Sequence, residues 1–320
     1  MDVPGIGAPR KETGRIIESP FIHVKWFGRS THRSRWRSGA IRRSACPLRV
    51  GAKQSVRART FPRLFGLDSC KTAESRIVKL DGMPSYEIFG RFYDAVMGDR
   101  AESAKQVSEL LRVSKPSART VLELGCGTGS ILKYLQDSYE VSGLDLSSKM
   151  LSIARKKVPR AKLFRQDMVD FQIDGRFDAV LCVFDSINHV RRFSDWKKVF
   201  ARVRQHLLPG GCFIFDINTQ RKLERHIAER PWVHPFGRNL LIMEVTAVAN
   251  HGSNWNIKVF EHVTRARYVL HEEDIVEVSF PLGKILGALR SCFVNVRVVD
   301  PSRRRATDKS ERLFFIAKGP

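Results

Sequence analysis

The sequence is poor in cysteine, and none of its six cysteines stands in a Cys-x-x-Cys pair or near a histidine at zinc spacing. This absence argues against a disulfide framework and a zinc module, so we expect no metal site. Most of the cysteines lie in apolar, strand-like runs, where a thiol behaves as a small buried hydrophobic group. Cysteine used in this way favours a reducing compartment, and we expect a cytoplasmic protein.

Long hydrophobic runs are also missing. A membrane-spanning helix needs about 18 to 20 apolar residues, whereas the longest candidate run, residues 207–217, is interrupted by Pro, Gly and Asp. We therefore expect no membrane partner. Hydrophobic residues still make up 42% of the 320 residues, which is enough to bury a sizeable core.

Acidic residues are scarce beside basic ones: 33 Asp and Glu stand against 56 Lys and Arg, a formal net charge of +23. Such a charge suggests nucleic acid or acidic lipid as a partner. Residues 1–80 alone hold 18 basic and 5 acidic residues, however, so more than half of the excess lies there. We predict that residues 1–80 form a basic, disordered arm. The arm also resembles a transit peptide in composition, which would make the protein organellar.

The pattern changes after residue 80, where short apolar runs alternate with stretches at helical spacing. This alternation predicts an α/β domain over residues 81–320 with a Rossmann-like, doubly wound, mostly parallel sheet. Residues 220–280 depart from the alternation and predict an antiparallel β insertion before the last helix, with strands at 240–248, 255–262 and 268–280. The seven strands expected in the main sheet are residues 120–124, 140–144, 162–164, 177–184, 212–217, 293–299 and 313–317.

A glycine-rich turn follows the first expected strand, where residues 121–129 read Val-Leu-Glu-Leu-Gly-Cys-Gly-Thr-Gly. Gly125, Gly127 and Gly129 let the backbone turn sharply and let a ligand approach closely. The spacing differs from the G-x-G-x-x-G dinucleotide motif, and no Lys-Ser/Thr pair follows, so a phosphate-binding loop is not favoured. Glu123, just before the glycines, would repel a pyrophosphate and suits a cationic ligand.

Acidic residues also stand at the ends of the next two strands. Asp145 ends the second strand, where a carboxylate can accept hydrogen bonds from both hydroxyls of a ribose. Asp167 and Met168 end the third, where the carboxylate can accept from an adenine amino group and the Met168 amide can donate to the ring. The carboxyl ends of the parallel strands, including the fourth near Phe184, share the edge of the sheet where such folds bind ligands.

These motifs, with Leu207-x-Pro-Gly-Gly, resemble the class I S-adenosylmethionine-dependent methyltransferases over residues 83–318. Residues 92–94, 184–189 and 213–219 are similar to the small-molecule branch of that family, which includes aminosugar N-methyltransferases. The resemblance implies S-adenosylmethionine as the cofactor and methyl transfer to a small amine, hydroxyl or carboxylate.

The resemblance also assigns roles within the cofactor site. It implies that the three glycines back the methionine moiety, that Glu123 stands near its amino group and that Asp145 binds the ribose. Asp167 and Met168 would bind the adenine, and Phe184 and Asp185 would pass close to the sulfonium. The expected cofactor-binding residues are Glu123, Gly125, Cys126, Gly127, Gly129, Asp145, Leu146, Met150, Asp167, Met168, Phe184 and Asp185.

Methyl transfer from a sulfonium asks the protein mainly for positioning, and a base is needed only when the acceptor must lose a proton. Tyr93 and His189 are the candidates for this catalytic role. Each has a plain structural alternative, because Tyr93 would equally serve as a core or lid residue and His189 as a cap of the next helix.

Two other functions compete with this one. An RNA methyltransferase could hold phosphates with its basic arm, but Phe184-Asp-Ser-Ile stands where an Asn-Pro-Pro-Tyr motif would be expected. A binding protein without activity could keep the same fold, although the intact glycine loop and strand-end acids argue against it. The sequence does not indicate an oligomeric state.

Removal of residues 1–80 should leave the affinity for S-adenosylhomocysteine unchanged, because none of the motifs lies in the arm. Isothermal titration of the full-length and shortened proteins makes the comparison. A folded but non-binding shortened protein would bring the arm back into the ligand site.

Overall fold

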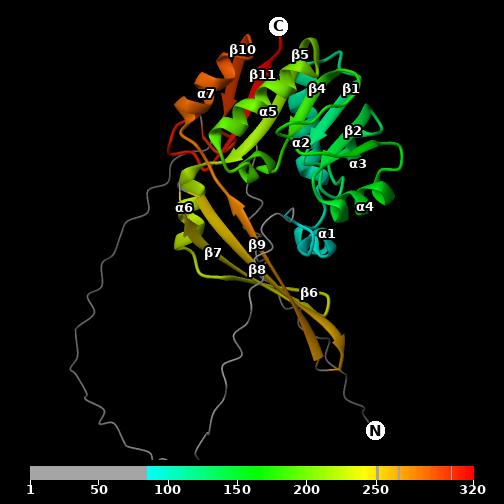
Figure 1. Cartoon of the computed structure of the whole chain (residues 1–320), viewed down its shortest axis with the longest axis vertical. Coiled ribbons are helices and arrows are strands. Elements are labelled where there is room, and N and C mark those ends of the chain that lie inside the picture. The colour runs from blue at the N-terminus through cyan, green and yellow to red at the C-terminus, as the bar shows by residue number, and fades with distance from the viewer. Residues whose placement is uncertain (1–84, 250–251, 266, 304) are drawn as a thin grey trace, which may run out of the picture. The chain divides into compact units, whose positions relative to one another are not determined.

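A computed structural model describes residues 85–249, 252–265, 267–303 and 305–320 (Figure 1). The predicted basic arm, residues 1–80, lies outside the described residues. Within these ranges, every helix is too short or too polar to span a bilayer.

Seven strands form the main sheet: β1 Thr120–Leu124, β2 Glu140–Asp145, β3 Lys162–Arg165, β4 Phe177–Cys182, β5 Leu207–Asn218, β10 Asn295–Val299 and β11 Arg312–Lys318. Their order is β10-β11-β5-β4-β1-β2-β3. Strands β1 to β5 pair in parallel, and β11 runs antiparallel to β5 and β10. The predicted Rossmann-like, seven-stranded sheet is thus confirmed.

Helices cover both faces of this sheet (Figure 1). One core cluster joins it to α5 (Phe193–Gln205) and α7 (Leu282–Arg290). The other joins it to α2 (Ala101–Ser114), α3 (Leu132–Leu135) and α4 (Ser148–Lys157). Side chains of β1 and β4 alternate between the two clusters, as the two-residue period of a strand requires. Apolar burial on both faces fixes the register, so the carboxyl ends of β1, β2 and β4 meet at one edge.

The insertion is an antiparallel sheet of four strands in the order β6-β7-β8-β9: β6 Trp232–Phe236, β7 Asn239–Val248, β8 Gly252–Thr264 and β9 Arg267–Glu277. The sequence predicted only three of them. It missed β6, which is short and contains Pro235, a residue that a sheet tolerates at its edge. The insertion also opens with a helix that was not predicted, α6 (Gln220–Ala228). Thr219 caps this helix, because its side chain accepts a hydrogen bond from the amide of Lys222.

The N-terminal segment, residues 85–97, packs on the second sheet. It consists of a turn, a 3₁₀ helix η1 (Phe89–Arg91) and the short α1 (Tyr93–Met97). The Glu273 carboxylate of β9 accepts hydrogen bonds from the backbone amides of Glu87, at 3.1 Å, and Phe89, at 2.7 Å. These hydrogen bonds hold the start of the segment against the second sheet. Tyr86 and Tyr93 of the segment lie next to the glycine loop at the edge of the main sheet.

Candidate active site

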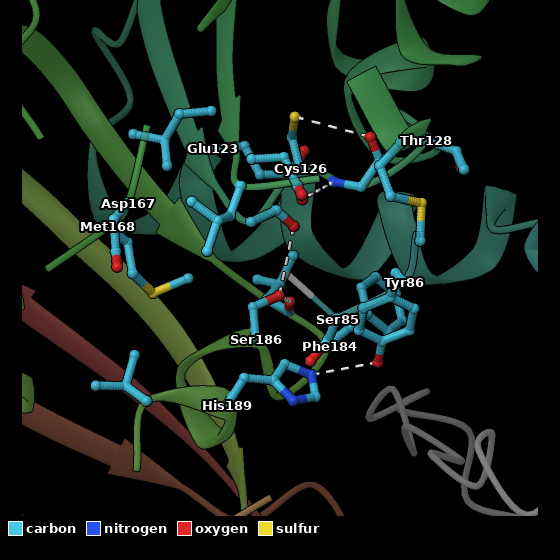
Figure 2. A pocket seen from close by; sticks show the side chains of 18 of the residues that line it. Ser85, Tyr86, Glu123, Cys126, Thr128, Asp167, Met168, Phe184, Ser186 and His189 are labelled. Carbon is cyan, nitrogen blue, oxygen red and sulfur yellow. Dashed lines mark hydrogen bonds between the residues drawn. The ribbon is translucent and has the colours of Figure 1, made fainter. Parts of the chain in front are cut away.

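A cavity of about 350 Å³ opens at the carboxyl ends of β1, β2 and β4 (Figure 2). Ten of the twelve predicted cofactor residues line it, and so do both predicted catalytic residues, Tyr93 and His189. The two exceptions are Gly129 and Asp185. The fold therefore brings most of the predicted site residues to one cavity, and their roles stay predictions.

The glycine loop takes the left-handed backbone conformation at Gly125, Gly127 and Gly129, with φ of +65°, +54° and +73°. A Cβ on Gly125 would lie 2.9 Å from the Cβ of Ser186, so this position needs a hydrogen. A Cβ on Gly129 would instead lie 3.1 Å from Cγ2 of Val158, at the end of α4. The cavity does not reach Gly129, whose absent side chain lets the loop pack against α4.

Asp145 lies between the loop and α4. Its carboxylate accepts from the amides of Gly127 and Ser147, each at 2.8 Å, and Ser147 caps α4 by accepting from the amide of Met150. Burial raises the pKa of Asp145, and the backbone amides oppose that rise. The carboxylate is thus oriented toward the cavity by two fixed donors, and its remaining lone pairs suit hydroxyl donors such as those of a ribose.

Glu123 is a buried carboxyl on the cavity wall, only 3% exposed. Its Oε2 has no hydrogen-bond partner among the described residues. Burial, and then the charge of Asp145, raises the pKa of Glu123 well above its ordinary value. An isolated carboxylate of this kind is costly, and a cationic group such as the amino end of the cofactor's methionine moiety fits it.

Arg100 was not predicted. Its side chain lines the same cavity and is 3% exposed. Its two terminal nitrogens have no hydrogen bond within normal geometry to any residue that the structure describes. The guanidinium carbon lies 4.7 Å from the centre of the Phe184 ring. The guanidinium also acts on the Tyr93 hydroxyl, whose pKa it lowers against the larger effect of burial. A buried guanidinium without a carboxylate partner among the described residues fits the carboxylate of a ligand. Arg100 and Glu123 together complement the two charges of an amino-acid zwitterion, so the residues present fit S-adenosylmethionine.

The adenine-side residues are less tightly defined by contacts. Asp167 and Met168 line the cavity together with Leu146, and Cys126 of the glycine loop does so from the opposite side (Figure 2). Oδ1 of Asp167 accepts from the amide of Val169 at 2.9 Å, which orients its carboxylate. The roles assigned to Asp167 and Met168 stay predictions.

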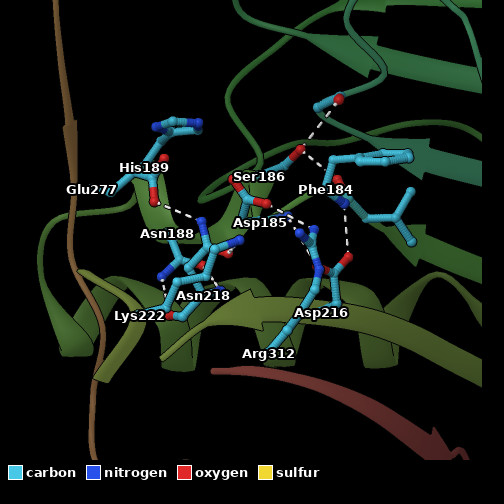
Figure 3. A network of polar contacts seen from close by, with 12 residues as sticks. Phe184, Asp185, Ser186, Asn188, His189, Asp216, Asn218, Lys222, Glu277 and Arg312 are labelled. Carbon is cyan, nitrogen blue, oxygen red and sulfur yellow. Dashed lines mark hydrogen bonds and ion pairs between the residues drawn. The ribbon is translucent and has the colours of Figure 1, made fainter. Parts of the chain in front are cut away.

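Asp185 is not part of this cavity wall, contrary to the sequence prediction. Its Oδ1 lies 2.7 Å from a terminal nitrogen of Arg312, which also binds Asp216 (Figure 3). Although burial favours the neutral acid, Arg312 holds the pKa of Asp185 below its ordinary value. Phe184 and Asp185 both have positive φ, 59° and 53°, and their amides donate to Asp216. The turn therefore aims Phe184 at the cavity and Asp185 away from it.

Asp185 instead lines a second, smaller cavity of about 40 Å³. This cavity lies between the N-terminal segment and the insertion sheet, with Glu277 of β9 as its other acid. It shares part of its wall with the first cavity, namely Tyr86, Tyr93, Arg100 and Phe184. The rest of its lining is apolar, from Phe89, Met97, Met243, Trp255, Ile257 and Ile275.

His189 ends the 3₁₀ helix η2 (Ser186–His189) and does not cap α5, which begins after Arg192. Its Nε2 lies 3.2 Å from the hydroxyl of Tyr86, and its Nδ1 lies 3.4 Å from the carbonyl of Val276 (Figure 2). A proton on Nδ1 satisfies that carbonyl, so Nε2 accepts from Tyr86. Burial lowers the pKa of His189, with Asp185 opposing, and the ring is neutral at pH 7.

Tyr93 lines both cavities and packs against its aromatic neighbours. Its ring meets those of Tyr86 and Phe89 edge-on, with both centroid distances at 5.8 Å. Burial raises the pKa of Tyr93, so its hydroxyl stays protonated at neutral pH. The catalytic roles predicted for Tyr93 and His189 stay predictions, and Tyr86 joins them as a neighbour that the sequence did not single out.

Gly129→Ala should destabilise the protein more than Gly237→Ala. Both positions have positive φ, which costs an L-residue about 1–2 kcal/mol. Only Gly129 has packed neighbours within 3.4 Å of the added methyl, which adds a further cost of about 1–3 kcal/mol. Urea unfolding of the two variants gives the comparison. Equal losses would show that Gly129 has no packing role.

Residues 121–211 match the family described as a methyltransferase domain. The dTDP-3-amino-3,6-dideoxy-alpha-D-glucopyranose N,N-dimethyltransferase of Streptomyces fradiae is 36% identical over 131 residues, covering 41% of this chain and 51% of that protein. The dTDP-3-amino-3,4,6-trideoxy-alpha-D-glucopyranose N,N-dimethyltransferase of Streptomyces venezuelae is 32% identical, covering 41% and 55%. The match thus spans about half the length of these two relatives.

A solved structure extends the likeness beyond this segment. An S-adenosylmethionine-dependent methyltransferase from Clostridium acetobutylicum ATCC 824 is 25% identical, with a TM-score of 0.63, and the alignment covers 73% of this chain and 98% of that one. The mostly parallel main sheet agrees with this likeness. Residues 121–211 thus form a methyltransferase domain, within a fold like that of S-adenosylmethionine-dependent methyltransferases.

Proposed function

We propose that the protein transfers a methyl group from S-adenosylmethionine to the nitrogen of a small-molecule amine. The observation that carries the proposal is the first cavity, where a buried carboxyl without a hydrogen-bond partner on Oε2 and a buried guanidinium without a carboxylate partner among the described residues stand beside a left-handed glycine loop. The cofactor, when bound, supplies an electrophilic methyl group, so the task left to the chain is to orient it and keep water away.

In the proposed complex, Glu123 binds the amino group of the methionine moiety and Arg100 binds its carboxylate. Asp145 accepts from the ribose hydroxyls, while Asp167 and Met168 contact the adenine. Each role follows from the donor or acceptor that the side chain or amide presents at the cavity wall.

The N-terminal segment closes this site from above. Nζ of Lys157 on α4 lies 2.7 Å from Oδ2 of Asp94, and Oδ1 of Asp94 accepts from the Thr128 hydroxyl at 2.7 Å. Asp94 thereby ties α1, and with it Tyr93, to the glycine loop. A closed, water-excluded site favours transfer to the acceptor over hydrolysis.

The second cavity supports an amine as the acceptor. Two carboxyl groups, Asp185 and Glu277, stand in its wall among aromatic rings, and the cation of that wall, Arg100, is the group that would bind the carboxylate of the cofactor. Carboxylates and aromatic faces attract an ammonium and repel a carboxylate acceptor. The printed names of the two Streptomyces relatives also describe methylation of aminosugars. Neither the cavities nor these names support the RNA alternative.

The cytoplasm is the compartment we propose. The described cysteines, Cys126, Cys182, Cys212 and Cys292, are all free thiols, and this supports a reducing environment.

Asp145→Ala should weaken binding of S-adenosylhomocysteine about 10- to 100-fold, because a fixed buried acceptor for the ribose is lost. Isothermal titration measures the affinity. Asp170→Ala, which removes an exposed carboxylate outside the cavity, serves as the matched control. Equal affinity in the Asp145 variant and the wild type would refute the ribose role.

An acceptor panel tests the chemistry of the reaction. We expect S-adenosylhomocysteine to form with at least one amine among dTDP-3-amino-3,6-dideoxyglucose, phosphoethanolamine and glycine, and not with trans-aconitate, which offers only carboxylates. Mass spectrometry places the new methyl group. Methylation of trans-aconitate alone would contradict the amine assignment, and failure to bind S-adenosylhomocysteine would contradict the whole proposal.

A further inference from the structure

Glu277 is a buried carboxyl that no sequence motif marks. It ends β9, is 3% exposed, and lines the second cavity with Asp185. The two cavities share the wall residues Tyr86 and Tyr93, so Glu277 stands in a cavity that adjoins the cofactor cavity. A group at this place can meet an acceptor atom that approaches the cofactor from the insertion sheet.

The hydrogen bonds of Glu277 leave one side of the carboxyl open. Its Oε2 accepts from Nδ2 of Asn218 at 3.0 Å, and Oδ1 of Asn218 in turn accepts from Nζ of Lys222 at 2.9 Å (Figure 3). No hydrogen bond reaches Oε1 of Glu277 from the residues that the structure describes. One oxygen is therefore anchored from behind while the other is available to a ligand.

The buried charged groups around this carboxyl are unevenly placed. Asp185 and Asp216 pair with Arg312, and the charge of Lys222 acts on Glu277 from behind through Asn218. Neither Lys222 nor Arg312 belongs to the lining of either cavity, whereas Asp185 and Glu277 face the second one. Arg100 is the cation in the wall of that cavity, and the proposed complex pairs it with the carboxylate of the cofactor.

We propose that Glu277 binds the ammonium of the acceptor and takes its proton before methyl transfer. This inference rests on the proposed function. One N–H bond of the ammonium breaks and an O–H bond forms on Oε1, which leaves a nitrogen lone pair. That pair forms the bond to the methyl carbon as the carbon–sulfur bond breaks, and the electrons of that bond stay on sulfur as a neutral thioether.

The proton affinity of Glu277 matches this task. Burial, and then the charge of Asp185, raises the pKa of Glu277 to about 8, against the opposing effects of Asn218, Lys222 and Arg312. An alkylammonium has a pKa of about 10 in water, so Glu277 is a better acceptor for its proton than a carboxylate with an ordinary pKa would be. His189 is a poorer match, because burial lowers the pKa of its ring.

A cation beside Glu277 favours the ionised carboxylate, so binding should lower the pKa of Glu277 and release a proton near pH 7. Lys222, whose pKa burial lowers to about 8, titrates in the same range, and the carboxyl itself must therefore be observed. The other groups around Glu277 are Tyr86 and His189, both neutral near pH 7, and the charged Asp185 and Arg312.

The experiment uses the full chain, labelled with ¹³C at glutamate side-chain carboxyls and saturated with S-adenosylhomocysteine. We expect one resonance with a midpoint near pH 8 that is missing in Glu277→Gln and present in Glu272→Gln, an exposed control on the same strand. Methylammonium chloride, which keeps its proton in water below about pH 10, should shift this midpoint downward. An unmoved midpoint overturns the proposal, whether or not the variant folds.

Turnover separates this inference from the proposed function. With an amine that the wild type methylates, Glu277→Gln should lower kcat about 100-fold or more while the affinity for S-adenosylhomocysteine is unchanged. Glu277→Asp, which keeps a carboxylate, should recover part of that loss and retain a pH-dependent rate. Wild-type turnover in Glu277→Gln would overturn the role of Glu277 alone, whereas a wild type that methylates no amine would overturn the proposed function.

Discussion

The buried ion pairs of Arg312 are the interaction on which the site depends. The guanidinium stands on β11 and binds Asp216 of β5 and Asp185 of the turn after β4. Through Asp216 it holds the amides of Phe184 and Asp185, which sit in a left-handed conformation that non-glycine residues avoid. Breaking a buried pair of this kind costs about 3–5 kcal/mol, so the strained turn persists, and Phe184 can form a wall common to both cavities.

Two acidic side chains connect the N-terminal segment to both parts of the fold. The Glu273 carboxylate, on the insertion sheet, accepts hydrogen bonds from two backbone amides of the segment. The Glu87 carboxylate, on the segment, accepts from the amide of Ser148 at the start of α4. Residues 87–89 of the segment are therefore held both by the sheet that lines the second cavity and by the helix that follows Asp145. Movement of either support would change the position of Tyr86 and Tyr93, so the two cavities are coupled through one short stretch of chain.

Local signals in the sequence were enough for the main sheet and for most of the predicted residues that line the first cavity, because the glycine loop and Asp145 each follow directly from a strand end. The residues that were missed have no such signal. Arg100 and Glu277 are ordinary charged residues until tertiary packing buries them, and their chemistry arises from neighbours distant in the chain. Gly129 and Asp185 were misplaced for a related reason, since a motif fixes a position in the chain but not which way the backbone turns there.

The same unpaired groups bear on stability. Oε2 of Glu123 and the terminal nitrogens of Arg100 are buried without protein partners in the described part of the chain, and each such group costs about 1–3 kcal/mol or more when charged. An apolar pair in these positions would make a more stable protein that could not recognise a zwitterion. A ligand that supplies both missing partners binds only the folded state, and its binding free energy then adds to the free energy of unfolding. Cofactor recognition and the stability of this edge of the sheet are, on this reasoning, one property of the same two side chains.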